Sequence, residues 1–299
     1  MNTASRFRQA IQAGDCLVSD GATGTNLQKR GLPPGRPSDV WVLEKPEEIV
    51  RLHRDFIDAG ANIILTDSFS GTTVNLARSG LAERARELNQ RAVALARQAV
   101  DGRPVYVAGS MGPLGEMLKP FGTLEEAAAE STYAEQAAAL AEAGVDLLVI
   151  ETQFDLTEAK AAVRAVRSVT DLPLVCSFSF DRGVRSMMGV RPAQFAEAVG
   201  PLGVDLVGIN CGRSLDDNLK ALGELRQACD LPIWFKPNAG LPHVNDDGES
   251  IYDVTPESMG AQVAAWIAAG ARVVGGCCGT SPAHVRQIAS ALAAAAGRA

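Results

Sequence analysis

Eight short apolar runs, separated by helical segments, constrain the fold of this chain more than any other feature. Each run shows little alternation of polar and apolar residues, which is typical of strands that are buried on both faces of a parallel sheet. Eight strand–helix pairs in 299 residues fit an α/β fold with a single (β/α)8 TIM barrel over residues 1–299. The runs lie at 16–23, 62–69, 105–112, 147–152, 173–180, 206–211, 233–240 and 272–279.

Three of the intervening segments carry clear helix signals. They cover residues 46–60, 124–144 and 255–270, and each ends in a glycine before the next run. In the third segment we expect Thr255 as the N-cap and Pro256 at the first helical position. A doubly wound open sheet is the alternative fold, but GATGT after the first run is not the glycine fingerprint of that fold.

Two long polar segments follow the first and the seventh run. Residues 26–45 read as a loop that contains proline and glycine, and residues 241–250 read as a second polar loop. In a barrel both loops lie at the carboxyl ends of the strands, where barrel enzymes build their sites.

Composition excludes several classes of function. A net charge of −7 with no basic run argues against a nucleic-acid surface. No stretch approaches the length of an apolar membrane span, and the N-terminus lacks the apolar core of a signal peptide. We therefore expect a cytoplasmic protein without a membrane or nucleic-acid partner. The oligomeric state stays open.

Polar residues follow the predicted strands at the end where a barrel has its mouth. Parallel strands bring such residues into one bowl. They are Asp20, Asp67, Ser68, Glu151, Asn210, Cys211, Lys236, Asn238, Cys277 and Cys278.

Three thiols are the sharpest feature of this set. Cys211 ends the sixth run, and Cys277 and Cys278 end the eighth among glycines that let the backbone bend. Three thiolate ligands with a fourth position open are the pattern of a catalytic zinc site. Buried structural cysteines and a redox-active pair are the alternatives. We interpret the other three cysteines, Cys16, Cys176 and Cys229, as buried small residues.

The charged residues allow more than one interpretation. Lys236 is either a Schiff-base lysine on a barrel strand or, as we favour, a solvated or ion-paired lysine at the mouth. Asp20 and Glu151 are an acid–base pair, anchors for a substrate ammonium group, or simple loop caps. His53 lies on an apolar helix face and is interpreted as a packing residue, while His243 and His284 receive no role.

The chain resembles the zinc-dependent homocysteine S-methyltransferase family over essentially its whole length. That family includes betaine–homocysteine methyltransferase and the homocysteine domain of cobalamin-dependent methionine synthase. The motifs are DGATGTNLQ (20–28), SMGPLGE (110–116), ET (151–152), GINC (208–211), KPNAG (236–240) and GGCCGT (275–280).

The resemblance implies a TIM barrel that transfers a methyl group to homocysteine and so forms methionine. It implies that Cys211, Cys277 and Cys278 bind Zn²⁺ and are the catalytic residues. Asp20 and Glu151 match residues that hold the amino group of homocysteine, and Asn238 lies beside or fills the open zinc position when substrate is absent. The backbone N–H groups of Gly21, Ala22 and Thr23 would face the carboxylate of homocysteine.

The resemblance leaves the methyl donor open. The animal betaine enzymes carry tyrosines where this chain has Ser70 and Thr152, and Asp67 and Ser68 replace the usual Asn and Thr. Phe69 matches the family, and Trp41, Phe121 and Phe154 are further aromatic candidates for holding a quaternary ammonium ion.

Several partners and functions are consistent with the sequence. The donor is betaine, another onium compound, or methylcobalamin on a corrinoid partner protein. Selenocysteine is an alternative acceptor. The alternative functions are a zinc and homocysteine module inside a corrinoid methyltransferase complex, and a Schiff-base lyase that uses Lys236.

Overall fold

The eight apolar runs form the eight strands of one parallel sheet. The computed structural model describes residues 3–244 and 250–296. Every predicted run contains or overlaps one strand, so the prediction of eight barrel strands is confirmed. The strands are β1 Leu17–Val18, β2 Ile63–Leu65, β3 Tyr106–Met111, β4 Leu147–Gln153, β5 Leu174–Phe178, β6 Leu206–Cys211, β7 Ile233–Pro237 and β10 Ala271–Val274.

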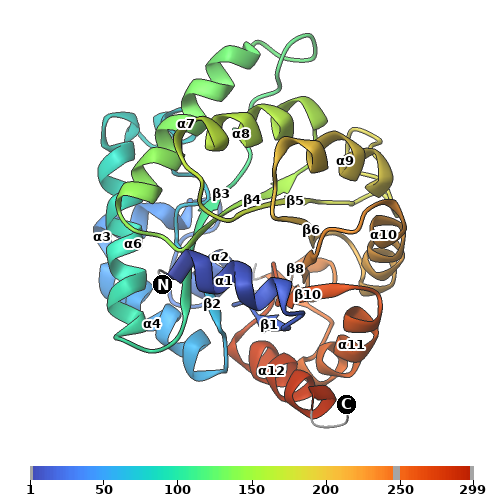
Figure 1. Cartoon of the computed structure of the whole chain (residues 1–299). Helices are drawn as coiled ribbons and strands as arrows, with labels where there is room; N and C mark the ends of the chain where they lie inside the picture. The colour runs from blue at the N-terminus through green and yellow to red at the C-terminus, as the bar shows by residue number, and fades with distance from the viewer. Residues whose placement is uncertain (1–2, 245–249, 297–299) are drawn as a thin grey trace.

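The sheet curls into a barrel (Figure 1). Its strand order is β1, β10, β7, β6, β5, β4, β3, β2, and each neighbouring pair is parallel. An isolated parallel bridge between Ser19 and Ile63 joins the first and last members of this order. The single TIM barrel is therefore confirmed. The order also places β6 across the barrel from β2. Residues at the ends of these two strands therefore lie on opposite sides of the barrel mouth.

Helices surround the sheet on its outside (Figure 1). The predicted helices correspond to α4 (Pro46–Asp58), α7 (Glu126–Glu142) and α11 (Pro256–Ala268). Thr255 caps α11 as predicted, because its hydroxyl oxygen accepts a hydrogen bond from the N–H of Ser258 at 3.2 Å. The helices are α1 Thr3–Gln12, α2 Thr23–Gln28, α3 Trp41–Glu44, α4 Pro46–Asp58, α5 Thr73–Ala77, α6 Ala85–Val100, α7 Glu126–Glu142, α8 Leu156–Val169, α9 Pro192–Val199, α10 Leu215–Ala228, α11 Pro256–Ala268 and α12 Pro282–Ala296, with 3₁₀ turns at η1 Ser38–Val40, η2 Ala82–Arg84 and η3 Gly200–Leu202.

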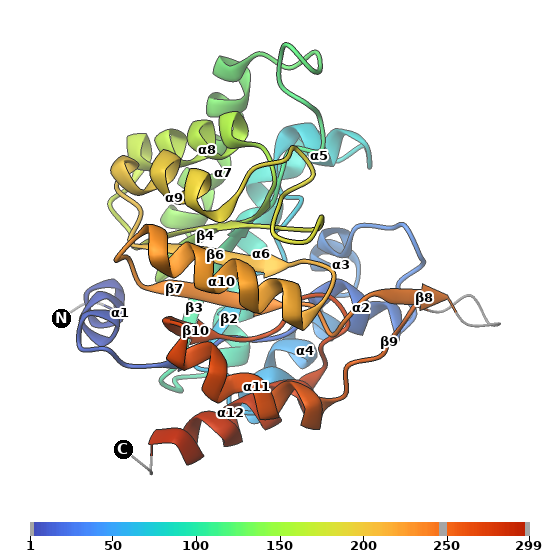
Figure 2. The same cartoon turned by 90° about the vertical axis from the view of Figure 1, so that its right-hand side faces the viewer.

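Different elements lie at the two ends of the barrel (Figure 2). Helix α1 covers the amino ends of the strands, where Phe7 and Ile11 join the apolar interior. At the other end an antiparallel hairpin projects, formed by β8 (Pro242–Val244) and β9 (Ser250–Tyr252). The hairpin occupies the second predicted polar loop, of which residues 245–249 lie outside the described residues.

The first predicted loop, residues 26–45, is only partly a loop. It contains the end of α2, the turn η1 and the short helix α3. Val40, Trp41 and Val42 are buried in the core, and the burial of these apolar side chains stabilises the ordered structure of the segment. The sequence prediction missed this because two prolines and two glycines lie in the first half of the segment.

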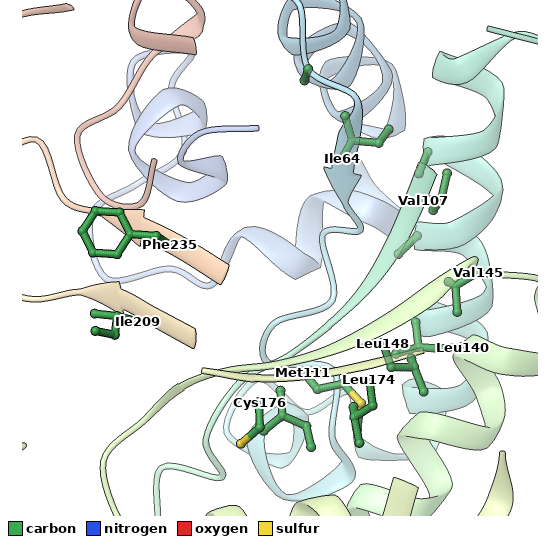
Figure 3. Close-up of a cluster of buried hydrophobic side chains, with 14 of the residues drawn as sticks. Ile64, Val107, Met111, Leu140, Val145, Leu148, Leu174, Cys176, Ile209 and Phe235 are labelled. Atoms are coloured by element: carbon green, nitrogen blue, oxygen red, sulfur yellow. The ribbon is translucent and has the colours of Figure 1, made fainter. Parts of the chain in front are cut away.

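Apolar side chains alternate between two cores along the strands. Ile63 and Leu65 of β2 belong to the barrel interior, together with Val149, Val175 and Trp234. Ile64, between them in β2, points instead into the core between sheet and helices, which Figure 3 shows with Val107, Leu148, Ile209 and other residues. Because apolar side chains pack against both faces of each strand, the runs in the sequence are continuously apolar.

The cysteines outside the candidate site behave differently from one another. Cys176 is fully buried in the outer core, as predicted (Figure 3). Cys16 and Cys229 are partly exposed, so the prediction of burial was wrong for these two, which lie at the amino end of β1 and at the end of α10. The interpretation of His53 as a packing residue is confirmed, because only 1% of it is exposed.

No helix within the described residues is both long and apolar enough to cross a membrane.

Candidate active site

A cavity of about 510 Å³ opens at the carboxyl ends of the barrel strands. Its walls come from the β1–α2 turn, from η1, from the segment after β2, and from the ends of β3, β4, β6, β7 and β10. Six of the polar residues predicted for the bowl line it: Asp67, Glu151, Cys211, Lys236, Cys277 and Cys278. The other four, Asp20, Ser68, Asn210 and Asn238, are not among the residues that line it.

The three predicted cysteines converge in this cavity. Cys211 ends β6, and Cys277 and Cys278 follow β10 after two glycines. The three Sγ atoms lie within 4.8 Å of one another, and those of Cys211 and Cys277 are 3.2 Å apart. A tetrahedral zinc with Zn–S bonds of about 2.3 Å holds its sulfurs about 3.8 Å apart. The donor set therefore fits zinc in both atom type and spacing.

The glycines around the cysteines are required by close contacts. A Cβ on Gly276 would lie 2.4 Å from Oγ1 of Thr280, and one on Gly279 would lie 2.2 Å from the ring of Tyr252. Hydrogen bonds fix the same segment, because the N–H of Cys277 donates to the carbonyl of Pro237 at 2.9 Å. The adjacent cysteines thus share a rigid turn that faces β6.

Two residues of the site adopt left-handed backbone conformations that non-glycine residues rarely take. The φ angles are 62° at Cys211 and 61° at Thr152. Buried Asn210 stabilises the conformation at Thr152: its Oδ1 accepts from the N–H of Thr152 at 2.8 Å, and its Nδ2 donates to the hydroxyl of Thr152 at 2.7 Å. Asn218 holds the carbonyl of Cys211 at 2.7 Å. Such strain concentrates at functional sites, where surrounding contacts maintain it.

The thiols influence one another's ionisation. Hydrogen bonds from Cys211 and Cys277 lower the pKa of Cys278 well below its ordinary value. The hydrogen bonds with Cys277 and Cys278, together with burial, raise the pKa of Cys211. One thiolate is therefore favoured in the cluster and further ionisation is opposed, which is the situation a bound cation relieves.

Two carboxylates near the thiols have different environments. Asp20 is 1% exposed and pairs with Lys236, whose Nζ lies 2.7 Å from its Oδ1. Glu151 lines the cavity and accepts a hydrogen bond from Oγ of Ser110 at 2.5 Å. Burial raises the pKa of Glu151 to about 7, although the charge of Lys236 opposes this shift. Asp20 is thus already neutralised by a partner, and Glu151 is the one of these two carboxylates that faces the cavity.

The other predicted substrate-binding residues differ in whether a protein group already occupies their hydrogen-bonding atoms. The N–H of Ala22 donates to Thr280, to its carbonyl at 3.2 Å and to its hydroxyl at 3.1 Å. Gly21 and Thr23 line the cavity, and within the described ranges their N–H groups have no protein acceptor. Asn238 does not line the cavity, and its Nδ2 donates to the carbonyl of Gly212 at 2.8 Å.

A pair of acidic side chains forms a second polar part of the cavity. Asp39 of η1 and Asp67 after β2 both line it, and they are 1% and 2% exposed. Sequence reasoning found Asp67 from its place at a strand end, but it missed Asp39. Ser110 and Tyr252 were missed too. Of these three, Ser110 sits at a predicted strand end, which was a usable signal.

Two aromatic rings line the cavity. Phe69 was predicted, and its ring packs against Gly112, where an added Cβ would lie 2.6 Å away. Tyr252 comes from the hairpin and was not predicted. Trp41, Phe121 and Phe154 do not line the cavity: Trp41 is 1% exposed, whereas Phe121 is 73% exposed.

Comparisons with known proteins converge on one family. Residues 17–292 match the family described as homocysteine S-methyltransferase. The chain is 34% identical to a methionine synthase of Mycobacterium tuberculosis and 32% identical to one of Mycobacterium leprae, in each case over 93% of this chain and 24% of the relative. It therefore spans about a quarter of the length of these curated relatives.

A solved structure extends this likeness to three dimensions. The metallated form of the homocysteine methyltransferase MmuM from Escherichia coli is 27% identical, with a TM-score of 0.82. The match covers 97% of this chain and 99% of that one.

Proposed function

Since the chain belongs to the homocysteine S-methyltransferase family, we propose that it transfers a methyl group to the thiol of homocysteine and so forms methionine. The observation that carries this proposal is the convergence of three cysteine sulfurs, from the ends of β6 and β10, on one cavity. We propose that these cysteines hold a zinc ion, a fit that the spacing of the sulfurs supports. The metallated MmuM structure shows that a relative of this fold takes up metal.

When bound, zinc would act as a Lewis acid that favours the thiolate form of a thiol substrate at neutral pH. The residues of the chain then bind and orient homocysteine. Glu151 accepts hydrogen bonds from its ammonium group, and Ser110 fixes the carboxylate of Glu151 through their 2.5 Å contact. The N–H groups of Gly21 and Thr23 face its carboxylate.

The chemical step is a displacement at the donor methyl carbon. The sulfur of homocysteine forms a bond to this carbon, while the bond between the methyl group and the donor nitrogen, sulfur or cobalt breaks. For an onium donor the bonding electrons leave with the donor, which becomes neutral at that atom. The thiol proton passes to solvent. No covalent intermediate with the protein is required.

A second candidate is a homocysteine module that receives its methyl group from a corrinoid partner. The observation that favours it is the likeness to two methionine synthases, of which the matched segment is 24% of the length. The lyase alternative is disfavoured, since Lys236 is paired with Asp20. The charges of Asp20 and Glu151 outweigh its burial and raise the pKa of its ammonium, which leaves no free lone pair for Schiff-base formation.

A donor panel tests the proposed function. Zinc-loaded protein receives homocysteine with betaine, S-methylmethionine, another sulfonium compound or methylcobalamin, and methionine is quantified. Cys277→Ser serves as the inactive variant, and Cys229→Ser, which removes a partly exposed thiol outside the site, serves as the matched control.

Turnover with one small donor in the wild type and in Cys229→Ser, but not in Cys277→Ser, supports a self-sufficient enzyme. Methionine from methylcobalamin alone supports the corrinoid module. Absence of methionine with every donor contradicts the methyl transfer proposed for the isolated chain.

A further inference from the structure

Asp39 and Asp67 form a wall of the cavity that the proposed mechanism leaves unused. Asp67 follows β2 and Asp39 belongs to η1. Because β6 stands across the barrel from β2, this wall faces the cavity from the side opposite Cys211. A molecule that approaches the cysteines from across the cavity therefore contacts these two carboxyl groups.

Neither carboxyl group has a basic partner within residues 3–244 and 250–296. Oδ1 of Asp67 accepts from the hydroxyl of Ser38 at 2.6 Å, and Oδ1 of Asp39 accepts from the N–H of Ser70 at 2.8 Å. Oδ2 of Asp67 is buried without any hydrogen-bond partner. An unpaired buried carboxylate oxygen is costly, so a ligand that supplies a positive charge there is favoured.

The raised pKa values of the two carboxyl groups also indicate that a positive charge would be favoured beside them. Burial, together with the negative charge of Asp39, raises the pKa of Asp67 well above its ordinary value. Burial also raises the pKa of Asp39, against the hydrogen bond from Ser70. Lys236 is the one basic side chain that lines the cavity among the described residues, and Asp20 already neutralises it. The wall therefore has an excess of negative charge that a proton or a cation compensates.

We propose that Asp39 and Asp67 bind the cationic centre of the methyl donor and that Asp67 determines specificity for onium donors without a carboxylate next to that centre. The inference rests on the proposed function and names the donor class. Phe69, two residues after Asp67, adds an aromatic face of the kind that holds quaternary ammonium and sulfonium groups. Betaine is disfavoured, because its carboxylate would approach the negative charge of this acidic pair in a poorly solvated wall.

Equilibrium binding of choline and of betaine tests the proposal without a measurement of methyl transfer. The two molecules differ by a hydroxymethyl group in place of a carboxylate, so their comparison isolates the charge. Dissociation constants are measured by isothermal titration calorimetry on the zinc-loaded full chain. We expect the wild type to bind choline roughly tenfold or more tightly than betaine, in keeping with the energy of a close charge contact in a partly buried site.

The variants separate this role from a structural one. Asp67→Asn keeps the shape and removes the charge, and we expect it to reduce the preference for choline roughly tenfold. Asp39→Asn is expected to act in the same direction and serves if Asp67→Asn does not fold. Asp253→Asn removes a charge directly after β9, where the side chain is 77% exposed, and is expected to leave the preference unchanged.

Three results would overturn the proposal. They are wild-type binding of betaine as tight as that of choline, equal weakening of both ligands in Asp67→Asn, and no choline binding at all. Failure of the proposed function looks different. In that case no donor yields methionine while the choline preference and its loss in Asp67→Asn are still observed.

Discussion

Nζ of Lys236 lies 2.7 Å from Oδ1 of Asp20, in a region where the two side chains are 4% and 1% exposed. The second oxygen of Asp20 accepts the backbone N–H of Leu65 at 2.8 Å. This ion pair ties the end of β7 to the end of β1 next to β2. It therefore braces the cavity wall that Lys236 shares with the cysteines, and it leaves Glu151 rather than Asp20 available to a substrate ammonium group.

Replacing Lys236 with methionine should destabilise the protein strongly. Asp20 then keeps a buried charge without a partner, which costs about 3–5 kcal/mol of unfolding free energy. The free energy of unfolding from urea titration is the measurement. Lys220→Met is the matched control, because that lysine is 69% exposed in its pair with Asp217, and its loss should cost under about 1 kcal/mol.

Combining Lys236→Met with Asp20→Asn should restore part of the lost stability, since the uncompensated charge is removed. A Lys236→Met variant as stable as Lys220→Met would contradict the view that the pair is buried and structurally important.

Loss of one cysteine ligand should abolish tight zinc binding. We expect about one zinc per chain in the wild type, and a fall in zinc affinity of more than about 100-fold in Cys278→Ser, because even an outer-shell partner contributes 10- to 100-fold. Competition with a chromophoric chelator measures this affinity. Cys176→Ala and Cys229→Ser should retain the metal, and unchanged affinity in Cys278→Ser would exclude this residue as a ligand.

The barrel and the thiol cluster were predictable because both follow from strand position. Strands buried on both faces produce continuous apolar runs, and parallel strands bring the residues after them to one end. Cys211 and Cys277 are distant in the chain, yet β6 and β10, at whose carboxyl ends they lie, are separated in the barrel by β7 alone. The glycines of the last motif were also informative, since Gly276 and Gly279 are fixed by contacts with Thr280 and Tyr252.

Other parts of the site depend on contacts that no periodicity encodes. Asp39 reaches the cavity because the segment after α2 buries Trp41 and folds back over the mouth, and Tyr252 arrives on a hairpin. Ala22 was predicted to face the substrate through its N–H, but Thr280 from the far end of the chain already accepts that hydrogen bond. Such assignments require the three-dimensional packing of loops.

Glu151→Gln should weaken homocysteine binding through its ammonium group alone. Hydrogen bonds to a charged partner contribute enough that their loss lowers affinity roughly tenfold or more. The test compares homocysteine with 4-sulfanylbutanoate, which lacks the amino group. We expect the affinity for homocysteine to fall and that for the analogue to stay within about twofold.

The control is Glu116→Gln, which removes a surface carboxylate that is 46% exposed beside Arg78. Parallel weakening of both thiols in Glu151→Gln would assign this residue to the support of the cavity rather than to recognition of the ammonium group.

His53 should make the protein less stable in acid. It is 1% exposed, its Nε2 has no partner, and burial lowers the pKa of its imidazole to about 4, although the charge of Asp20 opposes this shift. The unfolded chain has a histidine pKa of about 6.5, so below that pH the unfolded state binds a proton that the folded state does not. The free energy of unfolding therefore falls between about pH 6.5 and 4, by about 3 kcal/mol for this group.

His53→Leu removes the titrating group while keeping a side chain of similar volume in an apolar position. The difference in unfolding free energy between wild type and this variant should shift in favour of the variant as the pH is lowered across that window, measured by urea titration at each pH. His243→Leu changes a histidine that is 53% exposed, and it should leave the pH dependence of the wild type intact. Parallel curves for the wild type and His53→Leu would mean that His53 titrates in the folded protein as it does in the unfolded chain.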